Sequence, residues 1–193
     1  MRDVHTAEKI ASAARGILDQ EGHAAVTVRR VAGAVGITPM AVYRHYADHR
    51  GLLSALADAG FSELAARLTA LSLSVDMEEA LRQVLDANLD FAFEKPRLFE
   101  LMFLQPREGA RQFPKDFKAR KSPTANVMAD LLQRGMKAGY FGEDDPWEIT
   151  FEMGALLQGL VMLFLGGRVG MSKSHFRSYC HRSFRRYLNG IRK

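Results

Sequence analysis

The chain has 193 residues, of which 47% are hydrophobic and 25% charged, and this composition excludes a disordered or collagen-like protein. Cys180 is the single cysteine, so an internal disulfide framework is excluded and a reducing compartment, the cytoplasm, is expected. The net charge is +5, and residues 168–193 carry eight Lys and Arg without any Asp or Glu; this basic segment is either the solvated face of a last helix or a contact surface for nucleic acid or an acidic partner.

The first predicted element is a helix over residues 6–21. Apolar residues recur on one side of it at helical spacing, and Gly22 follows as a stop signal. The sequence before it, MRDVHTAEK, enters this amphipathic helix directly and does not have the pattern of a secretory signal peptide. We therefore expect the chain to begin with a structural helix.

Two short helices joined by a tight turn are predicted next. Thr27 is a favourable N-cap for the first helix, and Gly36 ends it in the left-handed conformation that glycine adopts most easily. Thr38 caps the second helix and Pro39 is its first residue. The apolar side chains that would face inward are Val28, Val31, Ala32, Val35, Val42 and Tyr46. The layout is typical of a DNA-reading helix-turn-helix, and the alternative is an ordinary helical hairpin with a polar outer face.

Beyond residue 47, every predicted element is a helix. A long helix over residues 49–73 comes first, and a charged, irregular stretch is expected at 105–122. Neither strand-like alternation nor an internal repeat is present. The sequence therefore predicts an all-α fold of about nine helices. The domains expected are a three-helix helix-turn-helix head at residues 1–48 and a helical body at residues 49–193.

Residues 151–167 are nearly all apolar and raise the question of a membrane span. Glu152 and Gln158 interrupt the run, and its length is below the ~20 residues that a bilayer requires. A helix buried in a core or in a dimer interface accounts for the run better. We expect no membrane partner.

The sequence resembles the tetracycline-repressor (TetR) family of bacterial transcription regulators. The resemblance is dense over about the first 55 residues, through the segments LDQEGHAAVTVRRVA, AVGITPMAVYRHY and DHRGLLSAL. It continues more loosely through EKPRLFELMF, RGMKAGYFGEDDPWEI and GALLQGLVMLFLGGR. It implies a homodimer that binds a double-stranded DNA operator.

The resemblance also implies which side chains contact DNA. Thr27 and Tyr43 match positions that grip backbone phosphate, and Arg29 matches one that reaches a base edge. Arg44 could make a bidentate contact to guanine, worth ~1–3 kcal/mol of discrimination. The complete set of candidate residues is Thr27, Arg29, Arg30, Thr38, Pro39, Met40, Ala41, Tyr43, Arg44, His45, His49 and Arg50.

One position departs from the family pattern. Where the family usually has a lysine just after the recognition helix, this chain has His49, followed by Arg50. A histidine is largely uncharged at pH 7, so Arg50 is the alternative phosphate contact.

For the body, the resemblance implies dimerisation through the last two helices and a cavity for a small, mostly apolar effector. Ala155 and Gly159 lie four residues apart and would permit close helix packing. The candidate interface residues are Ala155, Gly159, Leu160, Leu163, Phe164, Phe176, Tyr179 and Phe184. The candidate pocket residues are Phe91, Phe99, Met102, Phe103, Met128, Leu132, Phe151 and Leu156. The alternative is that such residues at helical spacing form the protomer's own core.

The function expected is repression of transcription, relieved when a ligand binds. The alternatives are an activator, a regulator without a ligand, and, in another class, a nonspecific nucleic-acid-binding or adaptor protein. An enzyme is not expected, because the chain has neither a Gly-rich phosphate loop nor a nucleophile elbow. His45 and His49 have a metal-like spacing, but it crosses the end of the recognition helix and lacks the usual glutamate. We therefore expect no metal, cofactor or catalytic residue.

Overall fold

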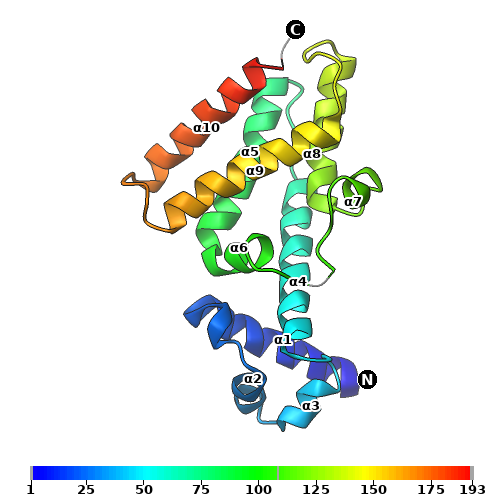
Figure 1. The fold of residues 1–193 in the computed structure, drawn as a ribbon, viewed down its shortest axis with the longest axis vertical. Coiled ribbons are helices and arrows are strands. Elements are labelled where there is room, and N and C mark those ends of the chain that lie inside the picture. The colour runs from blue at the N-terminus through cyan, green and yellow to red at the C-terminus, as the bar shows by residue number, and fades with distance from the viewer. Residues whose placement is uncertain (1, 108, 192–193) are drawn as a thin grey trace. The chain divides into compact units, whose positions relative to one another are not determined.

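The structure, a computed structural model, describes residues 2–107 and 109–191, and helices joined by loops make up these ranges (Figure 1). The described residues form ten α-helices and one 3-10 turn, with no β-strand. The all-α prediction is confirmed. The helix added to the expected nine is α7 (Lys115–Lys118), a single turn within the stretch that was predicted to be irregular.

Helices from two stretches that are separated in the sequence build one packing unit. The unit runs from the N-terminus to Phe61 and also includes Lys95–Ala110. Its helices are α1 (Arg2–Glu21), α2 (Val28–Val35), α3 (Pro39–Tyr43), the first part of α4 (His49–Thr69) and α6 (Pro96–Phe103). Its core contains Ile10, Leu18, Val31, Val42, Leu52 and Leu98, all fully buried.

Gly60 allows α6 to lie close to α4 within this unit. A Cβ atom at Gly60 would be 2.5 Å from Met102 Sδ and 3.0 Å from Leu98 Cδ2. Arg107, which follows α6, pairs with Asp58 of α4 at 2.8 Å. The predicted functional boundary between residues 48 and 49 stays a prediction.

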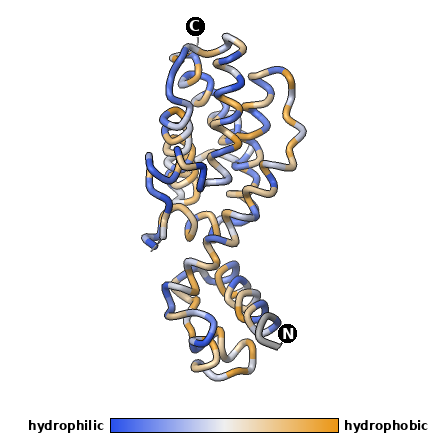
Figure 2. The backbone as a smooth tube through the Cα atoms, turned by 90° about the vertical axis from the view of Figure 1, so that its right-hand side faces the viewer, coloured by the Kyte–Doolittle hydropathy of each residue, from blue (hydrophilic) through white to orange (hydrophobic). Residues whose placement is uncertain are grey.

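The remaining residues, Ser62–Glu94 and Arg111 onward, form a second packing unit. It contains the end of α4, α5 (Met77–Glu94), α7, α8 (Pro123–Lys137), α9 (Pro146–Leu165) and α10 (Lys173–Asn189). α8 packs against α5 and α9, and α10 packs against α5 and α9. Hydrophobic and hydrophilic residues alternate along the chain (Figure 2), so each packed helix can turn an apolar side to its neighbours.

A charged cluster joins α5 to α10 at the edge of this core. The Asp86 carboxylate lies 2.6 Å from Arg177 Nη1 and 2.8 Å from His181 Nε2. Burial alone would raise the pKa of Asp86, but the hydrogen bonds from Arg177 and His181 outweigh it and hold this pKa below its usual value. Arg177 also pairs with Asp90. The ionised form of Asp86 therefore stabilises the contact between the two helices.

α9 presents an apolar face to solvent. Its exposed residues Phe151, Ala155, Gly159, Met162 and Leu163 follow helical spacing and form one stripe, which we call the α9 stripe. Among the described residues, α9 is the one helix that is long and apolar enough to cross a membrane, by length and composition alone. In its most apolar stretch of 18 residues, 28% is buried inside the protein. A core helix of a soluble protein satisfies the same criteria. The α9 stripe is therefore an apolar surface that the protomer covers in part only at Phe151, against which the rings of Phe113 and Phe117 pack.

Candidate nucleic-acid interface

Side-chain caps fix the two helices of the predicted helix-turn-helix. Thr27 Oγ1 accepts a hydrogen bond from the Arg30 amide at 3.3 Å, and Thr38 Oγ1 accepts one from the Ala41 amide at 3.3 Å. Gly36 has φ 76°, which is the left-handed conformation predicted for the end of α2. The turn therefore follows the chemistry that its residues predict, with Pro39 as the first residue of α3.

The two helices separate apolar and polar side chains as the spacing predicts. Val31 and Val42 are completely buried. Arg29 and Arg44 are exposed, and the large apolar groups of Met40 and Tyr43 are 67% and 46% exposed. A methionine and a tyrosine that stay in water beside two arginines form a surface able to contact both base edges and phosphate.

α3 is shorter than the recognition helix that the sequence predicts. It ends at Tyr43, and the amides of His45 and Tyr46 both donate to the Val42 carbonyl. Arg44 and His45 therefore project from the end of the helix and the following turn. Tyr46 packs inward as predicted, and burial raises the pKa of its hydroxyl group.

Arg30 and His49, both candidate DNA-binding residues, bond to other segments of the protein through their side chains. Arg30 forms a two-pronged ion pair with Glu21, with Nη1–Oε2 and Nη2–Oε1 distances of 2.9 and 2.5 Å. His49 Nε2 lies 2.5 Å from the Val26 carbonyl oxygen. Sequence reasoning missed both roles, because each partner lies on another segment and neither pair has a regular spacing. Of the other candidates, Ala41 and His45 are half-buried, and Thr27, Thr38, Pro39 and Arg50 are exposed.

The predicted pocket residues do not surround one described cavity. Phe99, Met102 and Phe103 belong to the first packing unit, where the rings of Phe99 and Phe103 lie 4.6 Å apart. The others belong to the second unit, where Phe91 and Leu132 are fully buried, Met128 and Leu156 are half-buried and Phe151 is exposed. Their role in ligand binding stays a prediction.

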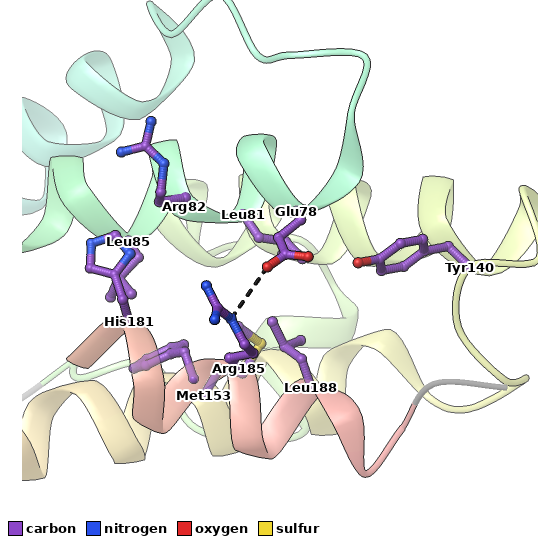
Figure 3. A pocket seen from close by; sticks show the side chains of 10 residues that line it. Glu78, Leu81, Arg82, Leu85, Tyr140, Met153, His181, Arg185 and Leu188 are labelled. Carbon is purple, nitrogen blue, oxygen red and sulfur yellow. Dashed lines mark ion pairs between the residues drawn. The ribbon is translucent and has the colours of Figure 1, made fainter. Parts of the chain in front are cut away.

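The second unit has a small hollow of its own, between α5, α9 and α10. Its volume is about 50 Å³, well below the ~300–1,000 Å³ of ordinary ligand sites. Figure 3 shows Glu78 and Arg185 facing each other across it, and their charged groups are 3.3 Å apart. The rest of the lining combines polar side chains with apolar ones: Arg82, Tyr140 and His181, and Leu81, Leu85, Met153, Phe184 and Leu188. None of the predicted pocket residues belongs to this hollow.

The predicted interface residues fall into three groups by burial. Ala155, Gly159 and Leu163 are exposed, whereas Leu160, Phe164 and Tyr179 are half-buried. Phe176 and Phe184 are only 0% and 6% exposed, and Phe164 stacks on Phe176 with ring centroids 4.3 Å apart. The assignment of Phe176 and Phe184 to a dimer interface needs correction, because both side chains fill the protomer's own core.

The described residues contain neither a metal-binding cluster nor a reactive thiol. No three His, Cys, Asp or Glu within the described ranges are grouped so as to hold a metal ion. Cys180 is buried, and burial raises the pKa of its thiol to about 11. The thiol is therefore protonated at neutral pH and behaves as a small apolar side chain.

The capped helix pair and its exposed basic and aromatic side chains define a helix-turn-helix DNA-binding protein. Residues 10–56 match the family model of the tetR family of bacterial regulatory proteins, and residues 81–187 match the tetracyclin repressor-like C-terminal domain. The chain therefore belongs to the tetR family of DNA-binding transcription regulators.

Solved structures share this fold over nearly their whole length. A protein of unknown function from Rhodococcus sp. RHA1 is 22% identical, with 97% of this chain and 95% of that chain covered and a TM-score of 0.76. A TetR-family regulator from Pectobacterium atrosepticum is 20% identical, with 99% and 96% covered and a TM-score of 0.74. The fatty acid degradation regulator FadR from Bacillus halodurans is 17% identical, with 96% and 99% covered and a TM-score of 0.67. No curated protein matches the chain at a significant level.

Proposed function

We propose that this protein represses transcription as a homodimer bound to a palindromic operator, and that a small, mostly apolar ligand releases it. The observation that carries the proposal is the exposed surface of Arg29, Met40, Tyr43 and Arg44 on a capped helix-turn-helix. Such a surface fits the major groove, where arginine reads guanine and apolar groups contact the thymine methyl. The proposed site of action is the cytoplasm, and no catalytic step, metal, cofactor or membrane is involved.

The α9 stripe supports the dimer. Ala155 and Gly159 are small and exposed, so a second helix could approach closely, and Met162 and Leu163 add apolar area beside them. Two heads joined in this way would read half-sites about one DNA turn apart. The linkage would raise the affinity for a full palindrome above that for a half-site by ~10²–10⁴-fold.

The ligand is proposed from the family resemblance and from the many Phe and Met residues of the body. One solved relative regulates fatty acid degradation, which is in keeping with an apolar effector. A ligand can release DNA only if it binds the released state more tightly than the DNA-bound state. In this proposal α4, which begins directly after the head and ends in the second unit, carries the change. An activator, or a regulator without a ligand, is the second candidate.

The substitution Gly159→Arg tests the dimer. Nothing lies within 4 Å of the Cβ position at Gly159, so the protomer can accept a side chain there. We expect sedimentation to show a monomer that binds a half-site but has lost the gain for the palindrome. Gly16→Arg is the matched control, because Gly16 on α1 is equally open and lies in the other unit. A Gly159→Arg protein that remains a dimer would contradict the proposed interface.

A reporter gene behind the operator tests the sign of regulation. Deletion of the regulator should raise transcription of the reporter, and a fall would favour the activator. Apolar candidate ligands are then added to the operator complex, and release is followed by fluorescence anisotropy. An effector should reduce the affinity for operator without unfolding the protein.

A further inference from the structure

We propose that His49 is a positioning residue for DNA recognition, and that Arg50 makes the phosphate contact at this place. His49 would hold the beginning of α2 through its hydrogen bond to the Val26 carbonyl group, and would not touch DNA. This inference rests on the proposed operator binding of the head and adds a role for one residue in it.

The geometry commits one nitrogen of His49 to the protein. Its Nε2 atom lies 2.5 Å from the carbonyl oxygen of Val26, 23 positions earlier in the chain. A carbonyl oxygen can only accept, so Nε2 carries the hydrogen and donates it. Val26 itself is fully buried, which fixes the acceptor in place. The bond therefore links the first residue of α4 to the segment that leads into α2.

The bond acts on the residue that starts the DNA-reading motif. Thr27 follows Val26 directly, and its hydroxyl group caps α2 through the Arg30 amide. The peptide group between Val26 and Thr27 therefore has both of its polar atoms bonded: His49 donates to its carbonyl oxygen, and its N–H group donates to the Ala25 carbonyl at 3.0 Å. The ion pair between Arg30 and Glu21 fastens the same turn of α2 to the end of α1. Contacts that must be accurate to ~0.5 Å depend on such supporting bonds.

Arg50 has the properties that a phosphate contact needs and that His49 lacks. Its guanidinium group is permanently charged and can bond a phosphate with two N–H groups. The side chain is exposed, and no acidic side chain of the described residues pairs with it. Asp48 is turned to the backbone, since its carboxylate caps α4 by accepting from the Gly51 amide at 2.7 Å.

The salt dependence of binding separates the two roles. A fluorescein-labelled duplex, recovered by selection from a random library on the wild-type protein, is titrated at several salt concentrations. The slope of log K against log salt is negative, and loss of one phosphate contact reduces its magnitude by about 0.9. We expect this change for Arg50→Ala. His49→Ala should weaken binding by about 5–10-fold, the typical effect of one lost hydrogen bond, with the slope unchanged.

Amide replacements at position 49 provide the matched controls. The side-chain nitrogen of glutamine can occupy the place of Nε2, whereas that of asparagine is too short to reach it. His49→Gln should therefore restore both the affinity and the amide chemical shift of Thr27 measured by NMR without DNA, and His49→Asn should restore neither. Equal thermal-unfolding midpoints for Arg50→Ala and for the three variants at position 49 would show that the changes in binding do not come from global unfolding.

The outcomes distinguish this inference from the function on which it rests. A reduced salt slope for His49→Ala, or a His49→Gln protein as weak as His49→Ala, would overturn the positioning role. A wild-type protein that selects no sequence would overturn the proposed operator binding instead. In that case the Thr27 amide shift would still report whether His49 holds the start of α2.

Discussion

Arg30 of α2 lies against Glu21 of α1, and two charge-assisted hydrogen bonds join their side chains. The hydrogen bonds from Arg30 are the main cause that lowers the pKa of the Glu21 carboxyl group. The neighbouring Arg29 is exposed and has no acidic partner among the residues that the structure describes. The two adjacent arginines of α2 therefore differ in role: Arg30 holds α2 to α1, whereas Arg29 is available to contact DNA.

This difference predicts that substitution of the two arginines affects the salt dependence of operator binding differently. Arg29→Ala should weaken operator binding and change the salt slope or the base preference, because Arg29 is free to reach DNA. Arg30→Ala should leave the salt slope unchanged, since its charge is already paired with Glu21. Anisotropy titrations at several salt concentrations measure both. A larger slope change for Arg30→Ala than for Arg29→Ala would contradict the assignment.

Gly135 of α8 predicts a stability effect in the second unit. A Cβ atom there would be 2.6 Å from Cδ2 of the buried Phe141 ring and 3.3 Å from Met77 Cε. Overpacking of this kind costs about 1–3 kcal/mol, and the better helix propensity of alanine returns only about 1 kcal/mol. We expect Gly135→Ala to lower the free energy of unfolding measured by urea denaturation.

Gly16 on α1 provides the control for this measurement. Nothing lies within 4 Å of its Cβ position, so Gly16→Ala should stabilise the protein by about 0.5–1 kcal/mol. Two glycine-to-alanine changes of opposite sign would establish that helix contact, and not propensity, decides the effect at Gly135. A stabilising effect of Gly135→Ala would mean that Phe141 moves aside without cost.

The lowered pKa of Asp86 predicts that the free energy of unfolding depends on pH. Its folded-state pKa is lowered, so its ionised form stabilises the protein above the unfolded pKa of about 3.9, and this contribution is lost as the pH falls through the lower folded pKa. Asp86→Asn should therefore reduce the thermal midpoint at pH 7. The difference from wild type should shrink below about pH 4. A difference that stays constant from pH 7 to pH 3 would indicate lost packing and not a lost charge.

The local architecture of the head could be predicted because its signals are local. Thr27, Gly36, Thr38 and Pro39 determine where each short helix begins or ends, and all four act where the sequence predicts. The inward positions Val31 and Val42 follow from helical spacing alone. Such chemistry depends on neighbours within a few residues and is therefore visible in one sequence.

Roles that depend on partners far away in the chain could not be predicted. Arg30 and His49 looked like DNA contacts because exposed basic residues in a helix-turn-helix usually are, yet Glu21 and Val26 hold their polar groups. Phe176 and Phe184 follow the same helical spacing as interface residues would. Only the packing of α10 against α5 and α9 shows that they belong to the core. Periodicity identifies a buried side but does not say which chain buries it.

Binding of the purified protein to the DNA upstream of its own gene, at two salt concentrations, tests the central claim most directly. The comparison is between wild type and the double variant Tyr43→Ala/Arg44→Ala, whose side chains are exposed and contribute little to the core. The account predicts palindrome-specific binding by wild type at both salt concentrations and its loss in the variant. Weak, sequence-indifferent binding that survives the substitutions and disappears with salt would contradict it, because phosphate attraction alone behaves in that way.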